Sequence, residues 1–285
     1  MRKFKYSKED FSEDSLPNNR REQFFDIVKM EWRTLFYIGL SIFLTTLPLA
    51  ALLLFKSSYS VVLTAQISSA GEANDRLYKF VLDMMFDGGI FLCIFLVALG
   101  IAGNLRVLRN LAWAEGVLFW RDFKDGIRKN YKPTILILLV AFLFLLINHT
   151  ASFAIDLYAV SPMNVILIVI LDFVEIAIFL PVGFVGLSLN SFYNVGAKKT
   201  VTASFIVMIK TYLLELPLVA FLILLHFALS IPGIYIGAII FTISSLLLSP
   251  LLSLMTFLSH VSCYDKLINQ SYPEYLFRGL YKIKD

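Results

Sequence analysis

Long apolar blocks alternate along the chain with short polar blocks that are rich in lysine and arginine. A helix needs about 20 apolar residues to cross the hydrocarbon core of a membrane, and each apolar block reaches roughly that length. The pattern therefore predicts membrane-spanning helices joined by polar segments. We expect six spans, at 34–55, 86–104, 134–155, 164–190, 204–230 and 233–262.

These spans predict an all-α membrane protein: a six-span helical bundle with kinked helices and cytoplasmic interfacial helices. The kinks are expected at Pro48, Pro181, Pro217 and Pro250, each of which interrupts a predicted span. A proline inside a helix removes one backbone hydrogen bond and bends the helix. Neighbouring helices must then satisfy the carbonyl group that the proline leaves free.

The polar segments predict the organisation outside the membrane. Residues 1–18 mix charges of both signs and are expected to form a flexible cytoplasmic tail. The run Asn19-Arg20-Arg21-Glu22 fits a helix-capping box, so 19–33 is expected to form an interfacial helix that leads into the first span. The transmembrane domain then covers 34–262, with an outer loop at about 56–85, and 263–285 forms a cytoplasmic C-terminal segment.

The composition agrees with a membrane protein and narrows its partners. Of the 285 residues, 58% are hydrophobic and 16% are charged, whereas soluble domains carry roughly 25% charged residues. The net charge of +4 is mild, so we expect contact with the lipid bilayer and its anionic headgroups and no nucleic acid as a partner. Cysteine and histidine do not follow the spacing of a metal site, and we expect neither a metal nor a cofactor.

Lysine and arginine are distributed unevenly between the two sides of the predicted bundle. Eight lie between the first residue and Arg33, and seven lie within 105–133. The outer loop on the opposite side carries Lys56, Arg76 and Lys79. Because polar segments rich in lysine and arginine stay in the cytoplasm, we expect both termini to be cytoplasmic.

The segment 105–133 mixes aromatic and charged residues within a few helical turns. Phe119, Phe123, Ile127 and Tyr131 recur every four residues, which predicts one apolar stripe on a helix, and Pro133 is expected to end this helix before the third span. Such a helix either lies in the headgroup layer or docks a cytoplasmic partner, such as the ATPase or transporter subunit that binds permeases of ATP-driven systems. The candidates for partner or membrane-surface contact are Phe119, Trp120, Phe123, Lys124, Ile127 and Arg128.

The run GIAGNLRVLRNLAWAEGVLFWRDFKDGIRKNY, which begins at Gly100, resembles the YesL-like family of bacterial integral membrane proteins of unknown function. The resemblance implies a multi-span protein of the bacterial cell membrane that accompanies carbohydrate uptake and utilisation systems, and it supplies no catalytic residues. It rests on Gly103, the run Val107-Leu108-Arg109-Asn110-Leu111, Trp113, Glu115-Gly116, the run Trp120-Arg121-Asp122-Phe123, and Gly126, Ile127, Lys129 and Asn130.

Polar side chains recur at helical spacing in spans four to six. At about 1.5 Å of rise per residue, Glu175 and Glu215 both fall near the middle of the membrane, and one of them is expected to be protonated if they face each other. These groups form either a polar cavity or solute site, or buried and neutral packing contacts. The candidates for the buried polar site are Asp172, Glu175, Glu215, His226, Ser245, Ser249 and Ser253; the three serines share one face of span six with Thr242, Thr256 and His260.

Three functions remain open at this point. The first is a permease-like or accessory subunit of solute uptake, with carbohydrate suggested by the family resemblance. The second is a non-catalytic scaffold or regulator that docks a cytoplasmic partner through the 105–133 loop. The third is a membrane-embedded enzyme; we do not favour it, because no catalytic residues or metal-binding histidine pair stand out in the sequence.

Overall fold

The computed structural model describes residues 17–67, 72–158, 166, 169–170, 173–193, 197–230, 234–272 and 274–280. Within these ranges the elements are helices and no strand occurs. Six helices are long and apolar enough to cross a membrane, so the predicted all-α, six-span bundle is confirmed. The candidate crossings are Trp32–Tyr59, Leu77–Ala112, Phe119–Ile155, Glu175–Phe192, Lys199–Leu229 and Tyr235–Leu267.

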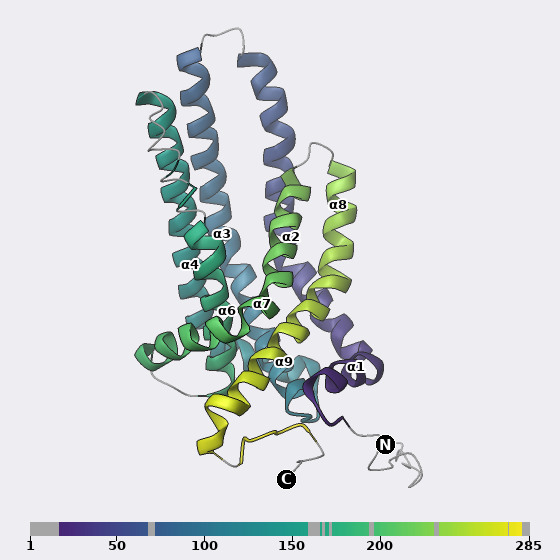
Figure 1. The fold of residues 1–285 in the computed structure, drawn as a ribbon. Helices are drawn as coiled ribbons and strands as arrows, with labels where there is room; N and C mark the ends of the chain where they lie inside the picture. Colours follow the sequence, from purple (N-terminus) through teal and green to yellow (C-terminus); the bar gives the residue numbers. More distant parts are fainter. Residues whose placement is uncertain are drawn as a thin grey trace.

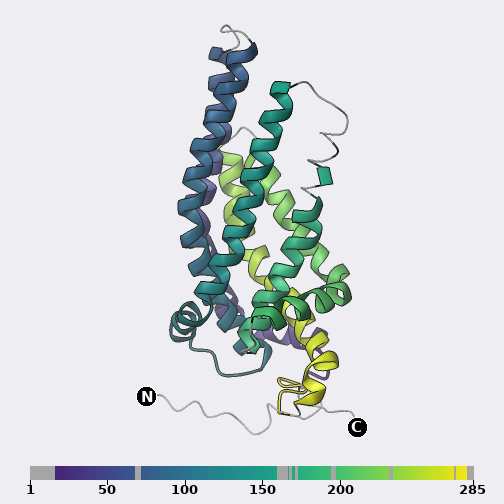
Figure 2. The same cartoon turned by 90° about the vertical axis from the view of Figure 1, so that its left-hand side faces the viewer.

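The helices pack side by side along one long axis (Figure 1). At one end lie α1, the start of α2 and the end of α9, and we call this end the base; α2 and α3 reach furthest from it in both views (Figures 1 and 2). In chain order the helices are α1 (Arg20–Met30), α2 (Trp32–Ile67), α3 (Glu72–Ala112), α4 (Phe119–Tyr158), η2 (Glu175–Phe179), α6 (Leu180–Phe192), α7 (Ala197–Ser230), α8 (Ile234–Ile243), η3 (Ser244–Leu248), α9 (Ser249–Leu267) and η4 (Asn269–Ser271).

The expected outer loop at 56–85 is wrong, because helices α2 and α3 occupy this segment on both sides of residues 68–71, which lie outside the described part. Contacts between the two helices hold this extension together. Lys56 Nζ lies 2.6 Å from the carboxylate of Asp83, and the ring of Phe55 packs against Tyr59 and Phe86. The polar residues that suggested a loop therefore pair across two helices.

Helix α4 runs through Pro133, which was expected to end a helix. The side of α4 that packs against α3 is small and polar, so the two backbones approach closely. A Cβ atom on Gly126 would lie 2.6 Å from the carbonyl oxygen of Gly103, and the ring of Phe123 covers Gly103 itself. The amide of Asn130 donates to the carbonyl of Ala102 at 3.3 Å. This side contact supports the helix through the proline.

Two of the expected proline kinks take the form of a wide, π-helical turn. The turn η2 ends two residues before Pro181, and η3 ends two residues before Pro250. Because a proline ring collides with the carbonyl four residues earlier, an inserted residue relieves the collision. The carbonyl four residues before Pro250 belongs to Leu246, and its oxygen lies against Gly39 of α2, where a Cβ atom would stand 2.3 Å from it.

The predicted cap of the first helix is confirmed, since the side chain of Asn19 accepts a hydrogen bond from the backbone N–H of Glu22. The helix α1 is shorter than the expected 19–33 segment and ends at Met30. Its inner side buries Arg20, Gln23 and Ile27 against the rest of the base. The tail residues 1–16 lie outside the described part of the chain.

Arg20 ties four parts of the base together. Its guanidinium lies 2.7 Å from the carboxylate of Asp265 in α9, and both side chains are buried. It also donates to the carbonyl groups of Ala112, at the end of α3, and Arg278, in the C-terminal segment. Because a buried ion pair is stable only when its remaining groups are hydrogen-bonded, these bonds join α1, α3, α9 and the C-terminal segment into one unit.

The C-terminal segment is held by the end of α3 and the loop that follows it. The guanidinium groups of Arg109 and Arg278 each lie over the ring of Trp113, 4.4 Å from its centre. The ring also stacks on Tyr275, with ring centres 5.6 Å apart. Glu115 accepts from Arg278 at 2.8 Å. Cation–ring contacts of this kind are strongest when they are shielded from water, and Trp113 is buried.

Tyr193, directly after α6, completes the base. Its hydroxyl group donates to the side-chain oxygen of Asn269, and the amide of Asn269 donates to Asp265. Burial raises the pKa of the Tyr193 hydroxyl well above its usual value, more than the bond to Asn269 lowers it. The hydroxyl therefore remains a hydrogen-bond donor at neutral pH, and α6 is fixed to α9.

Candidate functional site

Three helices bring four buried side chains together close to the base. Helix α6 contributes Ser188, α7 contributes Glu215, and α9 contributes His260 and Tyr264. Each is at most 1% exposed. Residues four apart share one side of a helix, so His260 and Tyr264 on α9 face the gap between α6 and α7 together.

The four side chains form a continuous hydrogen-bonded chain, which we call the buried network. His260 Nε2 lies 3.3 Å from Glu215 Oε1, and His260 Nδ1 lies 2.9 Å from Ser188 Oγ. Ser188 Oγ is hydrogen-bonded in turn to the hydroxyl of Tyr264. At the other end, Thr211 Oγ1 donates to Glu215 Oε1 at 2.6 Å. One histidine therefore connects a carboxyl group on one helix with two hydroxyl groups on two others.

Glu215 is the most demanding group in this network. Its side chain is 0% exposed, and its basic partner is His260, which is charged only when protonated, rather than a lysine or arginine. The second oxygen, Oε2, is buried and has no hydrogen-bond partner among the described residues. A buried charge without full compensation is costly, and ionisable side chains inside membrane helices are functional candidates for that reason.

The network accepts two complete arrangements of its protons. In the first, both ring nitrogens of His260 donate, Ser188 donates to the carbonyl of Val185 at 3.0 Å, and Tyr264 donates to Ser188. In the second, Nδ1 accepts from Ser188, and Ser188 still accepts from the hydroxyl of Tyr264. Because the hydroxyl groups find a partner in both arrangements, the network tolerates a change in the proton content of the Glu215–His260 pair.

A serine, a histidine and a carboxylate in sequence also form the catalytic set of many hydrolases. Ser188 lacks the surroundings that such a nucleophile needs. It is 1% exposed and sits within α6, where its own N–H belongs to the helix. Acyl transfer requires room for a substrate carbonyl and donors aimed at the developing oxyanion. The packed arrangement therefore positions no substrate at Ser188.

Of the predicted acidic residues that the structure describes, Glu215 belongs to the buried network and Glu175 does not. Glu175 is half-buried in η2, roughly 20 Å along the helix from Ser188 at 1.5 Å per residue. Glu215 is bonded at the level of Ser188, so Glu175 and Glu215 do not face each other and the condition for one of them to be protonated is not met. Asp172 lies outside the described residues, and the side chain of His226, within α7, is likewise not described.

The predicted polar face of span six is divided. The π-helical turn η3 inserts one residue and changes the phase of the helix, so the positions before and after it no longer share one side. Thr242 is half-buried and donates to the carbonyl of Ala238 in its own helix, whereas Thr256 and His260 are buried. Ser245 is buried, and Ser249 and Ser253 are half-buried. The described side chains bonded to Glu215 are Thr211 and His260, and no serine is among them.

The predicted contact residues of 105–133 separate into two groups in the structure. Phe119 is buried, and Phe123 and Ile127 are half-buried, so these three belong to the packed side of α4. Trp120 is 66% exposed, and Lys124 and Arg128 are also exposed. The ring of Trp120 contacts Tyr37 of α2 with ring centres 6.3 Å apart. The candidates for surface contact are therefore Trp120, Lys124 and Arg128.

Sequence reasoning missed several polar residues that the fold pairs. Ser188 and Tyr264 gave no signal, because a serine or tyrosine in an apolar helix is ordinary. Asp87 of α3 lies 2.7 Å from His149 of α4, with Asp87 almost fully buried. An aspartate within an apolar block is itself a signal in a membrane helix, and Asp87 could have been found in that way.

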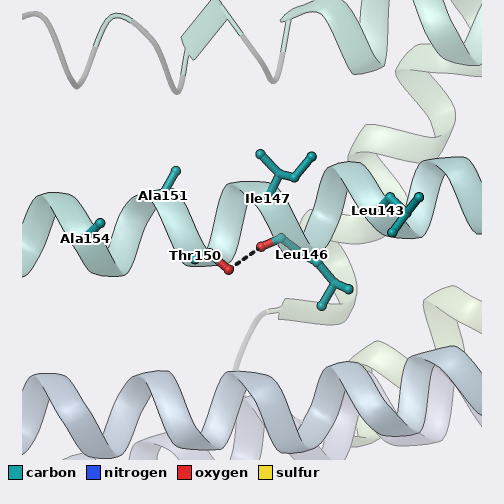
Figure 3. Close-up of a pocket in the computed structure, with 6 residues that line it drawn as sticks. All are labelled: Leu143, Leu146, Ile147, Thr150, Ala151 and Ala154. Atoms are coloured by element: carbon teal, nitrogen blue, oxygen red, sulfur yellow. Dashed lines mark hydrogen bonds between the residues drawn. The ribbon is translucent and has the colours of Figure 1, made fainter.

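A separate apolar groove of about 440 Å³ lies along α4, on the side shown in Figure 3. Its one polar lining group, the hydroxyl of Thr150, donates to the carbonyl of Leu146 at 2.8 Å. The groove contains none of the predicted site residues and offers a polar solute no free donor among the lining side chains. Its lining residues are Leu143, Leu146, Ile147, Thr150, Ala151 and Ala154.

Comparison of this chain with protein-family models, with curated proteins and with solved structures found no match. What the described residues establish is a helical protein with six candidate membrane crossings and a buried network between α6, α7 and α9.

Proposed function

We propose that this chain is a multi-pass protein of the bacterial cell membrane that acts as a permease-like or accessory subunit in solute uptake. The observation that supports this most directly is the fully buried Glu215–His260 pair inside two candidate membrane-crossing helices. Ionisable groups at such positions are expensive and typically belong to solute, ion or proton pathways. The resemblance of 100–131 to the YesL-like family supports carbohydrate as the solute class.

The proposed mechanism uses the two proton arrangements of the buried network. While α6, α7 and α9 are packed together, the network excludes water, and the pair keeps its proton content. Separation of α9 from α6 and α7 exposes Glu215 and His260, and protons or solute groups can then exchange. Because α9 also carries Asp265, which binds Arg20 at the base, movement of α9 acts on the cytoplasmic surface.

The proposed orientation has the base in the cytoplasm. Exposed cations of the described residues gather there on several helices. The segment that joins α2 to α3 at the far end of the bundle carries few lysines and arginines in the sequence. Cytoplasmic segments are the ones enriched in lysine and arginine. The residues that support this are Arg21 and Lys29 of α1, Arg33 of α2, Lys124, Arg128 and Lys132 of α4, Lys199 of α7 and Lys266 of α9.

A growth and uptake assay tests the proposal. In a deletion strain, the wild-type chain is compared with Glu215→Gln across a panel of carbohydrate sources that require the protein. Glutamine keeps the acceptor oxygen for Thr211 and His260 but does not exchange a proton, so we expect uptake to fall at least about ten-fold at equal protein level, a barrier change of roughly 1.4 kcal/mol.

Asp87→Asn is the matched control, since Asp87 is a second buried carboxylate hydrogen-bonded to a histidine. This variant is expected to keep normal uptake. Normal uptake by Glu215→Gln would remove the buried network from the mechanism.

A second candidate function is a non-catalytic scaffold or regulator that docks an ATPase or transporter subunit through the 105–133 loop. The exposed Trp120, beside exposed Lys124 and Arg128, favours this reading. In the same growth assay, the scaffold function predicts that Arg128→Glu is defective and that Glu215→Gln behaves as wild type. The transport function predicts the opposite for Glu215→Gln.

A further inference from the structure

The first part of α4 has two opposite sides. Residues four apart lie on the same side of a helix, and residues two apart lie on nearly opposite sides. One side is packed against α3, and the other is exposed. The buried side consists of Asp122, Gly126, Asn130 and Thr134, and the exposed side, which we call the cationic stripe, consists of Trp120, Lys124, Arg128 and Lys132.

The stripe carries three positive charges that the protein largely leaves uncompensated. No carboxylate of the described residues pairs with Lys124 or Lys132, and Arg128 lies 3.9 Å from an exposed Asp125, at the limit of an ion pair. Pairs between exposed side chains at this distance contribute little. The stripe is therefore complementary to a negatively charged surface.

Both ends of the stripe lie at the level where helices enter the membrane. Lys132 directly precedes the apolar part of α4, which begins at Pro133. At the other end, the ring of Trp120 contacts Tyr37, which lies near the beginning of the candidate crossing that starts at Trp32. If α4 projected straight out of the membrane, Trp120 would lie about 18 Å beyond Lys132. That position is outside the headgroup layer, which is roughly 6 Å thick.

The contact with Tyr37 therefore places the beginning of α4 along the membrane surface rather than away from it. Tryptophan and cationic side chains are the residues that occupy the headgroup layer. We infer that the cationic stripe is a binding surface for anionic phospholipid headgroups, with Lys124, Arg128 and Lys132 contacting the phosphates and Trp120 inserting at the acyl boundary. This inference does not depend on the solute-uptake proposal.

Full-length protein in bilayers of phosphatidylcholine and phosphatidylglycerol tests the inference. One lipid is brominated at a time, and quenching of Trp120 fluorescence measures which lipid lies against it. The chain has three tryptophans: Trp32 is replaced by phenylalanine, and Trp113 is retained because it is buried. In the protein with the wild-type stripe, brominated phosphatidylglycerol is expected to quench Trp120 more strongly than brominated phosphatidylcholine does.

The variant Lys124→Gln, Arg128→Gln, Lys132→Gln removes the three charges together. A cation near an anionic surface contributes about five-fold to its attraction, so the preference for phosphatidylglycerol is expected to fall by at least that factor. The control variant Lys29→Gln, Lys199→Gln, Lys266→Gln removes the same charge from exposed lysines elsewhere on the described base. It is expected to keep the preference.

Three results would overturn the inference. The first is an unchanged preference in the stripe variant, measured on protein whose thermal unfolding matches wild type. The second is an equal loss in both variants, which would assign the preference to net charge. The third is an unchanged lipid preference together with loss of a co-purifying protein in the stripe variant, which would make the stripe a protein-docking surface.

Discussion

Arg20 shows how one side chain determines the stability of the base. Its guanidinium is bonded to Asp265, Gln23 and the carbonyl groups of Ala112 and Arg278, while it is only 9% exposed. Removing one partner of a buried ion pair leaves the other charge without compensation. Loss of Arg20 is therefore expected to destabilise the fold mainly because the carboxylate of Asp265 would stay buried without a positive charge beside it.

Replacement of Arg20 by methionine is expected to lower the free energy of unfolding by about 3–5 kcal/mol, because Asp265 then stays buried and unpaired. Denaturant unfolding of the purified protein in detergent measures this change. Arg21→Met, at an exposed neighbouring position, is the control and is expected to change stability by less than about 0.5 kcal/mol.

Adding Asp265→Asn to Arg20→Met is expected to restore part of the loss, since the double variant removes the unpaired charge as well. Equal stability of Arg20→Met and Arg21→Met would show that the buried pair contributes nothing to the fold.

At the scale of single helices, prolines and glycines act together. Pro250 cannot donate to the carbonyl of Leu246, the π-helical turn η3 absorbs the collision, and Gly39 allows α2 to approach that same carbonyl. A proline in one helix and a glycine in another are thus parts of one contact. Small residues at such contacts are what lets membrane helices pack closely.

The variant Gly39→Ala tests this contact, because the new Cβ atom would stand 2.3 Å from the backbone oxygen of Leu246. Overpacking against backbone typically costs about 1–3 kcal/mol, so a lower thermal midpoint in detergent is expected. Gly88→Ala, where a Cβ atom meets nothing within 4 Å, should be neutral or slightly stabilising because alanine favours helix over glycine. A Gly39→Ala protein as stable as Gly88→Ala would contradict the close approach.

At the scale of the whole molecule, the number of spans could be predicted from sequence, because the membrane thickness sets the length of each apolar block. The helix bounds could not. The segment 56–85 looks like a loop until Lys56 meets Asp83 across two helices. Pro133 looks like a helix end until α3 supports α4 before the proline, at Asn130, and after it, at His149. Both errors came from contacts between residues far apart in the sequence.

The candidate site was predicted only in part for the same reason. Glu215 could be identified, since a carboxylate in an apolar span is conspicuous. Its partner could not, because depth was counted along straight spans and pointed to Glu175, whereas packing of α7 against α9 brings His260 instead. Ser188 and Tyr264 acquire significance only from the bonds they make.

The residues of the run that begins at Gly100 have structural roles in this fold. Gly103 and Gly126 form the close contact between α3 and α4, and Trp113 with Glu115 holds Arg278 of the C-terminal segment. The quoted run therefore specifies the base and the start of α4 rather than the buried network. A chain that shares this run is expected to share the base, while its network residues are free to differ.

The central claim is that the buried network works during uptake rather than only packing three helices together. The most direct measurement is the reaction of a cysteine at position 188 with a membrane-permeant maleimide in cells. Ser188→Cys is made in a chain whose two native cysteines are replaced by alanine. Labelling is followed in the presence and absence of the solute whose uptake requires the protein. Ser41→Cys, at a buried serine of α2 outside the network, is the control.

If the network opens to water during uptake, Ser188→Cys is labelled faster when the solute is present, while Ser41→Cys stays unreactive in both conditions. Ser188→Cys protein that supports normal uptake and is never labelled would contradict the account, because the network would then remain closed throughout the working cycle.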